Sequence, residues 1–213
     1  MSVTRVGREV EVKLALPSAF DGRRLLRKAG FGRLHRRLFE SNTLYDTPRR
    51  RLGARGSLLR LRSFAGRMLL TYKGPPEPGR HKSREELEIT ISDGLILETI
   101  LEQLGLIPSF YYEKYRTTFR RPGSSGLALL DETPIGVFLE LEGPPRWIDR
   151  TAREFGFDSS AYITASYGRL FLEYCRRRGL RTNRMAFPER RAGNSPSTPG
   201  KLPSTLEILA STN

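Results

Sequence analysis

The sequence predicts an α+β fold in which a closed, eight-stranded antiparallel β-barrel is bordered by peripheral helices. Three observations predict it. Apolar residues over 1–178 mostly alternate with period two, turn sequences separate several of the alternating runs, and charged residues repeatedly share one face of a run. A twisted antiparallel sheet of this length tends to close on itself, because closure removes its exposed edges.

The expected strands follow one another along most of the chain, with helical patterns at four places. Strands are expected at 8–16, 37–46, 57–64, 67–73, 83–91, 111–121, 126–132 and 136–142. Turn sequences at 65–66, 122–126 and 133–136 separate neighbouring strands at three of the junctions. Helices are expected at 17–29, 93–104, 149–155 and 166–178. Pro17 precedes the first helix, and Gly30 and Gly105 follow the first and the second.

The globular pattern ends at residue 178. We expect one domain over residues 1–178, which is long enough for a substantial core. A disordered basic tail is expected over residues 179–213. This segment is rich in Pro, Ser, Thr, Asn and Gly, so it cannot bury enough apolar surface to offset the entropy of ordering it.

Composition favours an anionic ligand and a cytoplasmic protein. The 213 residues carry a formal net charge of +14, and 31 of the 37 basic residues are arginine. Guanidinium groups suit bidentate recognition of phosphate or carboxylate. The single Cys175 excludes an intramolecular disulfide, and two histidines do not favour a structural zinc site. Because no apolar run reaches the ~20 residues that span a bilayer, and the N-terminus has no apolar signal segment, no membrane partner is expected. A monomer or a homodimer is expected.

Charged residues share faces of the expected strands. These faces carry Glu9, Glu11 and Lys13; Arg60 and Arg62; Lys73; Arg84, Glu86 and Glu88; Lys114 and Arg116; Asp131; and Glu140 and Glu142. A solvated outer face explains any one strand. Carboxylates two residues apart repel each other, however, and three strands repeat this arrangement. Converging carboxylates would bind a hard cation such as Mg²⁺ or Mn²⁺, and the bases would bind phosphate.

The width of the barrel suits this interpretation. Eight strands enclose room for roughly one small ligand. We therefore expect the charged faces to line a hydrated tunnel, while the apolar faces point outwards and are covered by the helices.

The chain resembles the CYTH superfamily, also called triphosphate tunnel metalloenzymes, through a series of ordered motifs. The sequence EVEVK at 9–13 is similar to the ExExK motif of that family. It is followed by TLYDTP at 43–48, LRLR at 59–62, TYKG at 71–74, REELEI at 84–89, YEKYR at 112–116, LLDE at 129–132, FLELEG at 138–143 and ITASYGRLF at 163–171. These motifs cover about residues 8–178. The family includes class IV adenylyl cyclases, thiamine triphosphatases and inorganic triphosphatases.

The resemblance implies a role for each charged face. The implied ligands of Mg²⁺ or Mn²⁺ are Glu9, Glu11, Glu140 and Glu142, with Asp131 as a further ligand or a neighbour of one. The implied triphosphate-binding residues are Lys13, Arg60, Arg62, Lys73, Lys114 and Arg116, with Glu86 and Glu88 orienting these bases. Lys114 and Tyr45 are the implied pair that activates water, although Tyr45 is equally compatible with a core aromatic. Ser166 and Tyr167 resemble a Ser-Tyr element of the C-terminal helix, for which packing is as good an explanation as ligand contact.

The implied function is metal-dependent hydrolysis of a triphosphate, either inorganic triphosphate or a small organic one such as thiamine triphosphate. Two alternatives remain open. One is a class IV adenylyl cyclase that converts ATP to cyclic AMP and pyrophosphate. The other is a binding module for polyphosphate or nucleic acid that uses outer arginines such as Arg23, Arg36 and Arg49. Solvated faces explain those arginines better, so nucleic acid is not the expected partner.

Overall fold

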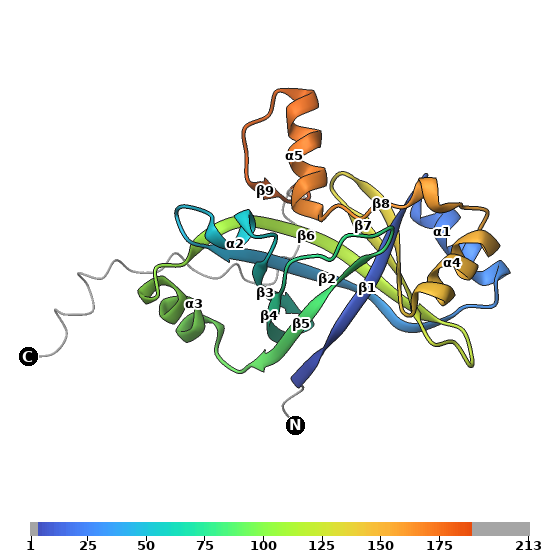
Figure 1. Cartoon of the computed structure of the whole chain (residues 1–213), viewed down its shortest axis with the longest axis horizontal. Helices are drawn as coiled ribbons and strands as arrows, with labels where there is room; N and C mark the ends of the chain where they lie inside the picture. Colours follow the sequence, from blue (N-terminus) through green and yellow to red (C-terminus); the bar gives the residue numbers. More distant parts are fainter. Residues whose placement is uncertain (1–3, 189–213) are drawn as a thin grey trace, which may run out of the picture.

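The computed structural model describes residues 4–188, and eight of its strands form a closed antiparallel barrel (Figure 1). Their bounds are β1 Thr4–Leu16, β2 Gly32–Asp46, β3 Leu58–Phe64, β4 Arg67–Lys73, β5 Lys82–Ile91, β6 Ile107–Arg120, β7 Leu127–Thr133 and β8 Gly136–Glu142. Their order in the sheet is β2-β3-β4-β5-β1-β8-β7-β6, and pairing of β2 with β6 closes it. The predicted fold is confirmed. Strands β1, β2 and β6 begin four or five residues earlier than the alternation indicates.

The hairpin between β3 and β4 shows how local sequence sets the register. Ala65 and Gly66 both have positive φ, at 47° and 73°. Two successive residues with positive φ form the type of two-residue turn whose twist matches that of the flanking strands. Phe64 therefore pairs with Arg67, and the alternation of the two strands stays in phase.

Within residues 4–188, five α-helices lie around the barrel, at α1 Ala19–Lys28, α2 Arg51–Ala54, α3 Gly94–Gln103, α4 Pro145–Glu154 and α5 Tyr167–Arg178. Side chains of Ser18, Asp93 and Ser166 accept backbone N–H bonds at the starts of α1, α3 and α5. Helix α4 begins four residues before the expected start because Pro145 suits a first helical position. No helix within residues 4–188 has both the length and the apolar character needed to cross a membrane.

Helices α1 and α4 cover the outer face of β1, β7 and β8. Leu14, Leu130 and Leu139 on that face are fully buried, together with Leu26 from α1 and Ile148 from α4. The apolar faces of these strands therefore point away from the barrel axis, as the sequence predicts. The residues that alternate with these apolar residues along each strand must therefore face the interior of the barrel.

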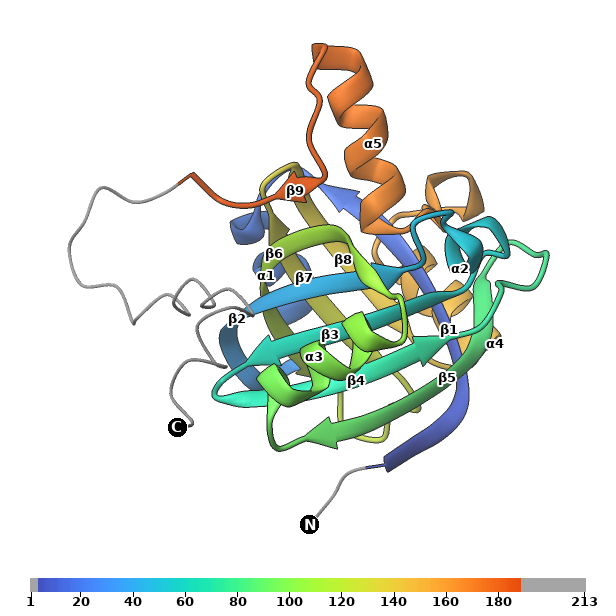
Figure 2. The ribbon, with the colours of Figure 1, turned by 90° about the vertical axis from the view of Figure 1, so that its left-hand side faces the viewer.

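Helix α3 covers less of its side of the barrel. It lies in front of β3 and β4 in Figure 2 and packs Leu101 against Tyr45 and Leu61. Ile96 on α3 and Leu104, directly after the helix, are exposed.

Helix α5 stands at one end of the barrel (Figure 2). Tyr167 and Phe171 of α5 pack there against Tyr112 of β6 and Phe138 of β8, in one buried cluster. Tyr112 and Phe138 lie on the faces of their strands that carry Lys114 and Glu140, so this aromatic cluster lies next to the interior at that end.

The packed body extends beyond residue 178, where the sequence predicts that it ends. A short strand, β9 Arg184–Met185, pairs in parallel with Tyr111 and Tyr112 of β6. Strand β7 pairs with β6 only from Tyr115 onwards, so this edge of β6 is available to β9. Met185 is fully buried, which removes residues 179–188 from the expected tail. Residues 189–213 of the expected tail lie outside the described residues.

Candidate active site

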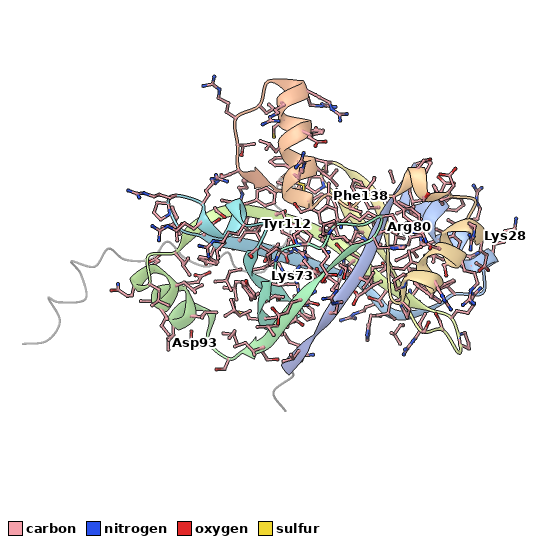
Figure 3. The ribbon with its side chains drawn as sticks, in the orientation of Figure 1. Lys28, Lys73, Arg80, Asp93, Tyr112 and Phe138 are labelled. Atoms are coloured by element: carbon pink, nitrogen blue, oxygen red, sulfur yellow. The ribbon has the colours of Figure 1, made fainter. Side chains whose placement is uncertain are left out.

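A cavity inside the barrel is lined mainly by charged side chains. Lys73 and Tyr112 lie inside the barrel in Figure 3, whereas Lys28 and Asp93 lie on the periphery. The charged lining consists of Glu9, Glu11, Lys13, Arg60, Arg62, Lys73, Lys82, Arg84, Glu86, Glu88, Lys114, Arg116, Glu140 and Glu142. Leu44, Leu58, Tyr112, Ser166, Tyr167 and Gly168 complete it. Thus every predicted site residue except Asp131 and Tyr45 lines one cavity.

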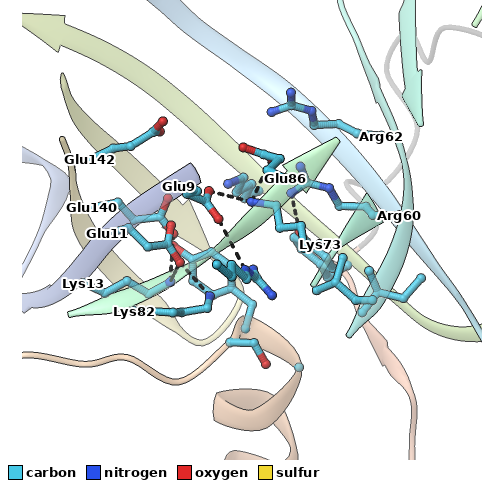
Figure 4. Close-up of a pocket in the computed structure, with 18 of the residues that line it drawn as sticks. Glu9, Glu11, Lys13, Arg60, Arg62, Lys73, Lys82, Glu86, Glu140 and Glu142 are labelled. Atoms are coloured by element: carbon cyan, nitrogen blue, oxygen red, sulfur yellow. Dashed lines mark hydrogen bonds and ion pairs between the residues drawn. The ribbon is translucent and has the colours of Figure 1, made fainter. Parts of the chain in front are cut away.

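The acidic wall of this cavity comes from the neighbouring strands β1 and β8. Glu11 pairs directly with Glu142 in the register of these strands, and Lys13 pairs with Glu140. Glu9 lies two residues before Glu11 on the same face, and all four carboxylates project toward the cavity in Figure 4. The alternation of β1 and β8 therefore brings four carboxylates to one side.

Three lysines bind the carboxylates of this wall. The Nζ atoms of Lys13 and Lys82 both donate to Oε1 of Glu11, at 3.0 and 2.7 Å. Lys73 Nζ lies 2.5 Å from Glu9 Oε1 and 3.0 Å from Oε1 of Glu86. All of these side chains are buried, so each charge is neutralised by neighbours on the wall rather than by bulk water.

These contacts determine which groups are charged. Burial raises the pKa of Glu11, but the charges of Lys13 and Lys82 outweigh burial and hold that pKa well below its ordinary value. Burial lowers the pKa of Lys82 to about 8, because the attraction of Glu11 only partly offsets it and Lys13 and Arg84 also lower it. Glu11 is shared by two ammonium groups, which explains why both partners of the Lys82–Glu11 pair have lowered pKa values.

Arg60 and Arg62 enter the cavity from β3, on a different side from the acidic wall (Figure 4). Arg62 Nη2 donates to Glu88 at 3.2 Å, and Arg60 Nη2 lies 3.9 Å from the same carboxylate. In the described part of the chain, no atom accepts a hydrogen bond from the buried Nε of Arg60 or of Arg62. Burial and then the charge of Arg60 lower the pKa of Arg62. Positive charge at Arg62 is therefore incompletely compensated. Burial also lowers the pKa of Arg60, but Tyr112 and the carboxylates of Glu86 and Glu9 outweigh burial and raise it.

Asp131 lies behind the cavity lining, not in it. Its carboxylate is completely buried and accepts hydrogen bonds from Lys114 Nζ at 2.9 Å, from Tyr167 Oη at 2.8 Å and from two guanidinium nitrogens of Arg116, each at 2.6 Å. Arg116 also donates to Glu140. Three of these four bonds hold bases in place, so the geometry gives Asp131 the role of an anchor for Lys114 and Arg116 instead of a ligand in the cavity.

Tyr45 is also outside the cavity, so the prediction that it acts on water is wrong. It lies on the outer face of β2 under α3, and its hydroxyl donates to Glu98 at 3.0 Å. A bulge between Leu44 and Tyr45 interrupts the register with β6 at this position. The tyrosine that faces the cavity from β6 is Tyr112. Burial raises the pKa of Tyr112, but the charges of Arg60 and Lys114 outweigh burial and lower it below its ordinary value.

The predicted site omits Lys82 and Arg84, although both follow the alternation that places Glu86 inside. Lys82 lies just before residue 83, where the strand is expected to start, so the prediction does not include it. Glu40 is the third omission: it is buried on β2, with its carboxylate 3.6 Å from Lys114 Nζ and 3.9 Å from Arg62 Nη1. Glu40 lies in a regular stretch of β2, but the neighbours on its face of the strand are the uncharged Leu38, Asn42 and Leu44, so no repeated charge in the sequence signals it.

The donor chemistry of the acidic wall fits a hard divalent cation. Carboxylate oxygens are the ligands that Mg²⁺ and Mn²⁺ prefer, and the lowered pKa values of Glu11 and Glu140 keep these donors ionised. Across residues 4–188, however, no three acidic, histidine or cysteine side chains come together as a ready-made metal site. Lysine ammonium groups occupy the positions next to the carboxylates.

Comparison with known proteins agrees with this geometry. The sequence model of the CYTH domain matches residues 7–155, which include all eight barrel strands except the first three residues of β1. The chain belongs to the CYTH domain family. A relative from Methanocaldococcus jannaschii, named "Putative adenylate cyclase MJ0240", is 28% identical over 134 residues, which cover 63% of this chain and 75% of that protein.

Two solved structures illustrate the similarity of the CYTH fold. The PH1819 protein of Pyrococcus horikoshii OT3 has a TM-score of 0.66 and 26% identity, and the match covers 78% of this chain and 99% of that one. A Hippeastrum protein, described as a "Putative adenylyl cyclase" with a dominant triphosphatase activity, has a TM-score of 0.55 and 21% identity over 82% of this chain and 97% of that one. This second similarity concerns the fold alone.

Proposed function

We propose that this CYTH protein hydrolyses a triphosphate, either inorganic triphosphate or a small organic one, with the help of a divalent cation. The observation that carries the proposal is the state of Arg60 and Arg62. Their guanidinium groups lie in the cavity, their buried Nε donors lack protein acceptors in the described chain, and the positive charge of Arg62 is incompletely compensated. A polyanion would supply both the acceptors and the charge.

The other bases suit the same ligand. Lys73, Lys114 and Arg116 line the cavity from β4 and β6, so several donors surround the same space as Arg60 and Arg62. Phosphoryl transfer passes through a loose transition state in which charge spreads over the phosphate oxygens, so positioning and neutralisation dominate catalysis. Rigidly held cations provide both of these effects.

Glu9, Glu11, Glu140 and Glu142 are the residues that would hold Mg²⁺ or Mn²⁺. When bound, such a cation neutralises charge on phosphate oxygens and lowers the pKa of water. Glu9, Glu11 and Glu140 are held by lysines, so they are poorly placed to act as bases. Asp131 is proposed as a neighbour of this metal site and not as a ligand. Arg116 connects the two, because it binds Asp131 and also contacts Glu140.

Lys114 is the proposed residue that orients the attacking water. Its ammonium is held between Asp131 at 2.9 Å and Glu40 at 3.6 Å, and it lies over the ring of Tyr167 at 5.3 Å from the ring centre. Water would attack the terminal phosphorus, the bond to the bridging oxygen would break, and phosphate and the diphosphate product would leave.

A cyclase is the second candidate, because the relative from Methanocaldococcus jannaschii is named for that activity. In a cyclase the ribose 3′-hydroxyl of ATP would attack the α-phosphorus, the bond from that phosphorus to the bridging oxygen would break, and pyrophosphate would leave. The cavity would bind the triphosphate group in the same way for both reactions.

One experiment separates these candidates. The purified protein is incubated with Mg²⁺ or Mn²⁺ and with tripolyphosphate, thiamine triphosphate or ATP, and phosphate, pyrophosphate and cyclic AMP are quantified. Release of phosphate supports hydrolysis, and cyclic AMP with pyrophosphate supports cyclisation. A protein that transforms none of the three would contradict both.

Glu86→Gln and Glu85→Gln provide a matched pair of variants for this assay. The two residues are neighbours on β5, but Glu86 is buried against the cavity and Glu85 is exposed on the outer face. Activity that falls only in Glu86→Gln would support the interior site. Equal activity in both variants would contradict it.

A further inference from the structure

A carboxylate outside the barrel connects two segments that lead to lysines of the cavity. Asp149 lies on α4 with its side chain 15% exposed, and it does not line the cavity. Its Oδ1 accepts hydrogen bonds from His81 Nε2 at 2.7 Å and from Tyr162 Oη at 3.1 Å, and its Oδ2 accepts one from Arg80 Nη2 at 2.6 Å. Burial raises the pKa of Asp149, but the bonds from His81 and Tyr162 outweigh burial and lower it, so the carboxylate is ionised at neutral pH.

The first segment leads to Lys82. His81 is the residue directly before Lys82, and its side chain is 10% exposed, so the contact with Asp149 is largely shielded from water. Because the peptide unit between residues 81 and 82 is rigid, fixing the His81 side chain restricts the backbone from which Lys82 extends. Lys82 begins β5 and projects into the cavity.

The second segment leads to Lys13. Tyr162 is followed by Ile163, whose backbone N–H donates to the carbonyl of Lys13 at 2.9 Å and whose carbonyl accepts from Lys13 N–H at 3.0 Å. Both backbone groups of Lys13 are therefore paired with one residue, and that residue is next to the tyrosine bound by Asp149.

The two segments meet at one atom. Lys13 Nζ and Lys82 Nζ both donate to Oε1 of Glu11, and Figure 4 shows them approaching it together. Two flexible lysines would not both stay hydrogen-bonded to one buried oxygen, because ordering two long side chains costs conformational entropy. A fixed backbone under each lysine lowers that cost.

We propose that Asp149 is a positioning residue that fixes Lys13 and Lys82 on Glu11 through its bonds to His81 and Tyr162. Its effect on ligand binding rests on the proposed function, since it assumes that these lysines bind a triphosphate. Its effect on the lysines themselves does not depend on that assumption.

The test measures the reactivity of individual lysines in Asp149→Ala, with Glu154→Ala as the matched control on the same helix. Glu154 pairs with Arg121 at 2.7 Å and does not line the cavity. The chain has six lysines, so the labelling rate of each by an amine-reactive ester can be followed by peptide mass spectrometry. Exposed Lys28 is the reference for reagent activity.

Labelling of Lys13 and Lys82 is expected to rise about tenfold in Asp149→Ala, the change that loss of one hydrogen bond to a charged group produces. Lys73 and Lys114 are buried in the same cavity but have no contact with the Asp149 segments, so their rates are expected to stay constant. Equal increases at all four lysines would overturn the proposal, because they would indicate general loosening. Unchanged rates at Lys13 and Lys82 would also overturn it.

A second variant and a binding measurement complete the test. Asp149→Asn keeps the size of the side chain and one acceptor oxygen, so it folds more readily and is expected to show the same selective increase with a smaller amplitude. Calorimetry with tripolyphosphate is expected to show about tenfold weaker binding to Asp149→Ala than to the unmodified protein and Glu154→Ala. Absence of binding to the unmodified protein would contradict the proposed function, while the labelling rates would still decide the role of Asp149.

Discussion

Replacing Asp131 with asparagine tests whether this buried carboxylate anchors the bases of the cavity. The substitution keeps the volume of the side chain and removes its charge. Lys114 then retains only the carboxylate of Glu40 at 3.6 Å, and Arg116 retains only its contact with Glu140 among its short carboxylate bonds. Removing one partner of a buried charge network costs ~3–5 kcal/mol, and asparagine, which still offers one acceptor oxygen, is expected near the lower end of that range.

The magnitude can be measured by urea and thermal denaturation. For a chain of this length, about 3 kcal/mol corresponds to a fall in the midpoint of roughly 6–12 °C. The control is Glu132→Ala on the same strand. Glu132 faces outwards and pairs with the half-exposed Arg37, so its loss is expected to cost ~1 kcal/mol or less.

A metal-ligand role for Asp131 predicts a different result. If Asp131 served mainly as a metal ligand, its replacement would relieve repulsion among carboxylates and leave the free energy of unfolding unchanged or higher. A loss of stability no larger than that of Glu132→Ala would therefore refute the anchoring role.

Four further predictions concern the cavity and its surroundings. Glu142→Gln is expected to raise the Mg²⁺ concentration for half-maximal turnover by about tenfold or more, with an unchanged thermal midpoint. An unchanged Mg²⁺ requirement would contradict the proposal that the acidic wall binds the cation. Arg60→Ala is expected to weaken tripolyphosphate binding in calorimetry by ~1.5–3 kcal/mol, or about 10- to 150-fold. Lys82 is charged below its pKa of about 8 and neutral above it, so tripolyphosphate affinity is expected to fall as the pH rises through that value, and Lys82→Met should flatten this fall. Tyr45→Phe is expected to keep kcat within about twofold and to lose about 1 kcal/mol of stability with its bond to Glu98, as steady-state kinetics and urea denaturation would reveal.

Strand alternation was sufficient to predict the inner face of the barrel. Because side chains of a strand alternate strictly between two faces, placing Val12 and Leu14 under helices requires that Glu9, Glu11 and Lys13 face inwards. Alternation alone gives the inner face of β5, because Leu87 and Ile89 on its outer face are exposed and not covered by a helix of the described chain. The prediction depended on one physical property of strands and not on the identity of the ligand.

The burial of an inward-facing side chain and the identity of its hydrogen-bond partners could not be predicted in the same way. Alternation places Asp131 on the correct face of β7, but it does not reveal that Lys114, Arg116 and Tyr167 enclose its carboxylate. Tyr45 was misplaced because its motif suggested a role that its face of the strand does not permit. Asp149 has no periodic signal, since its importance arises only from tertiary contacts.

The C-terminal boundary was missed for a different reason. Residues 179–188 have the composition of a tail, and a two-residue strand has too little sequence to show a period. Met185 is buried because β6 is longer than β7 and leaves an edge for one more segment. Such complementarity between distant parts of a chain is invisible to local pattern.

The pairing of carboxylates with lysines inside the barrel has a consequence for the order in which ligands bind. A polyanion that enters must compete with Glu9 and Glu11 for Lys73, Lys13 and Lys82, and each carboxylate that loses its ammonium becomes an uncompensated negative charge. A cation that neutralises this charge favours the exchange, and the effect is reciprocal because binding free energies are linked. We therefore expect polyanion and divalent cation to bind with positive cooperativity, each weakly by itself and both strongly together.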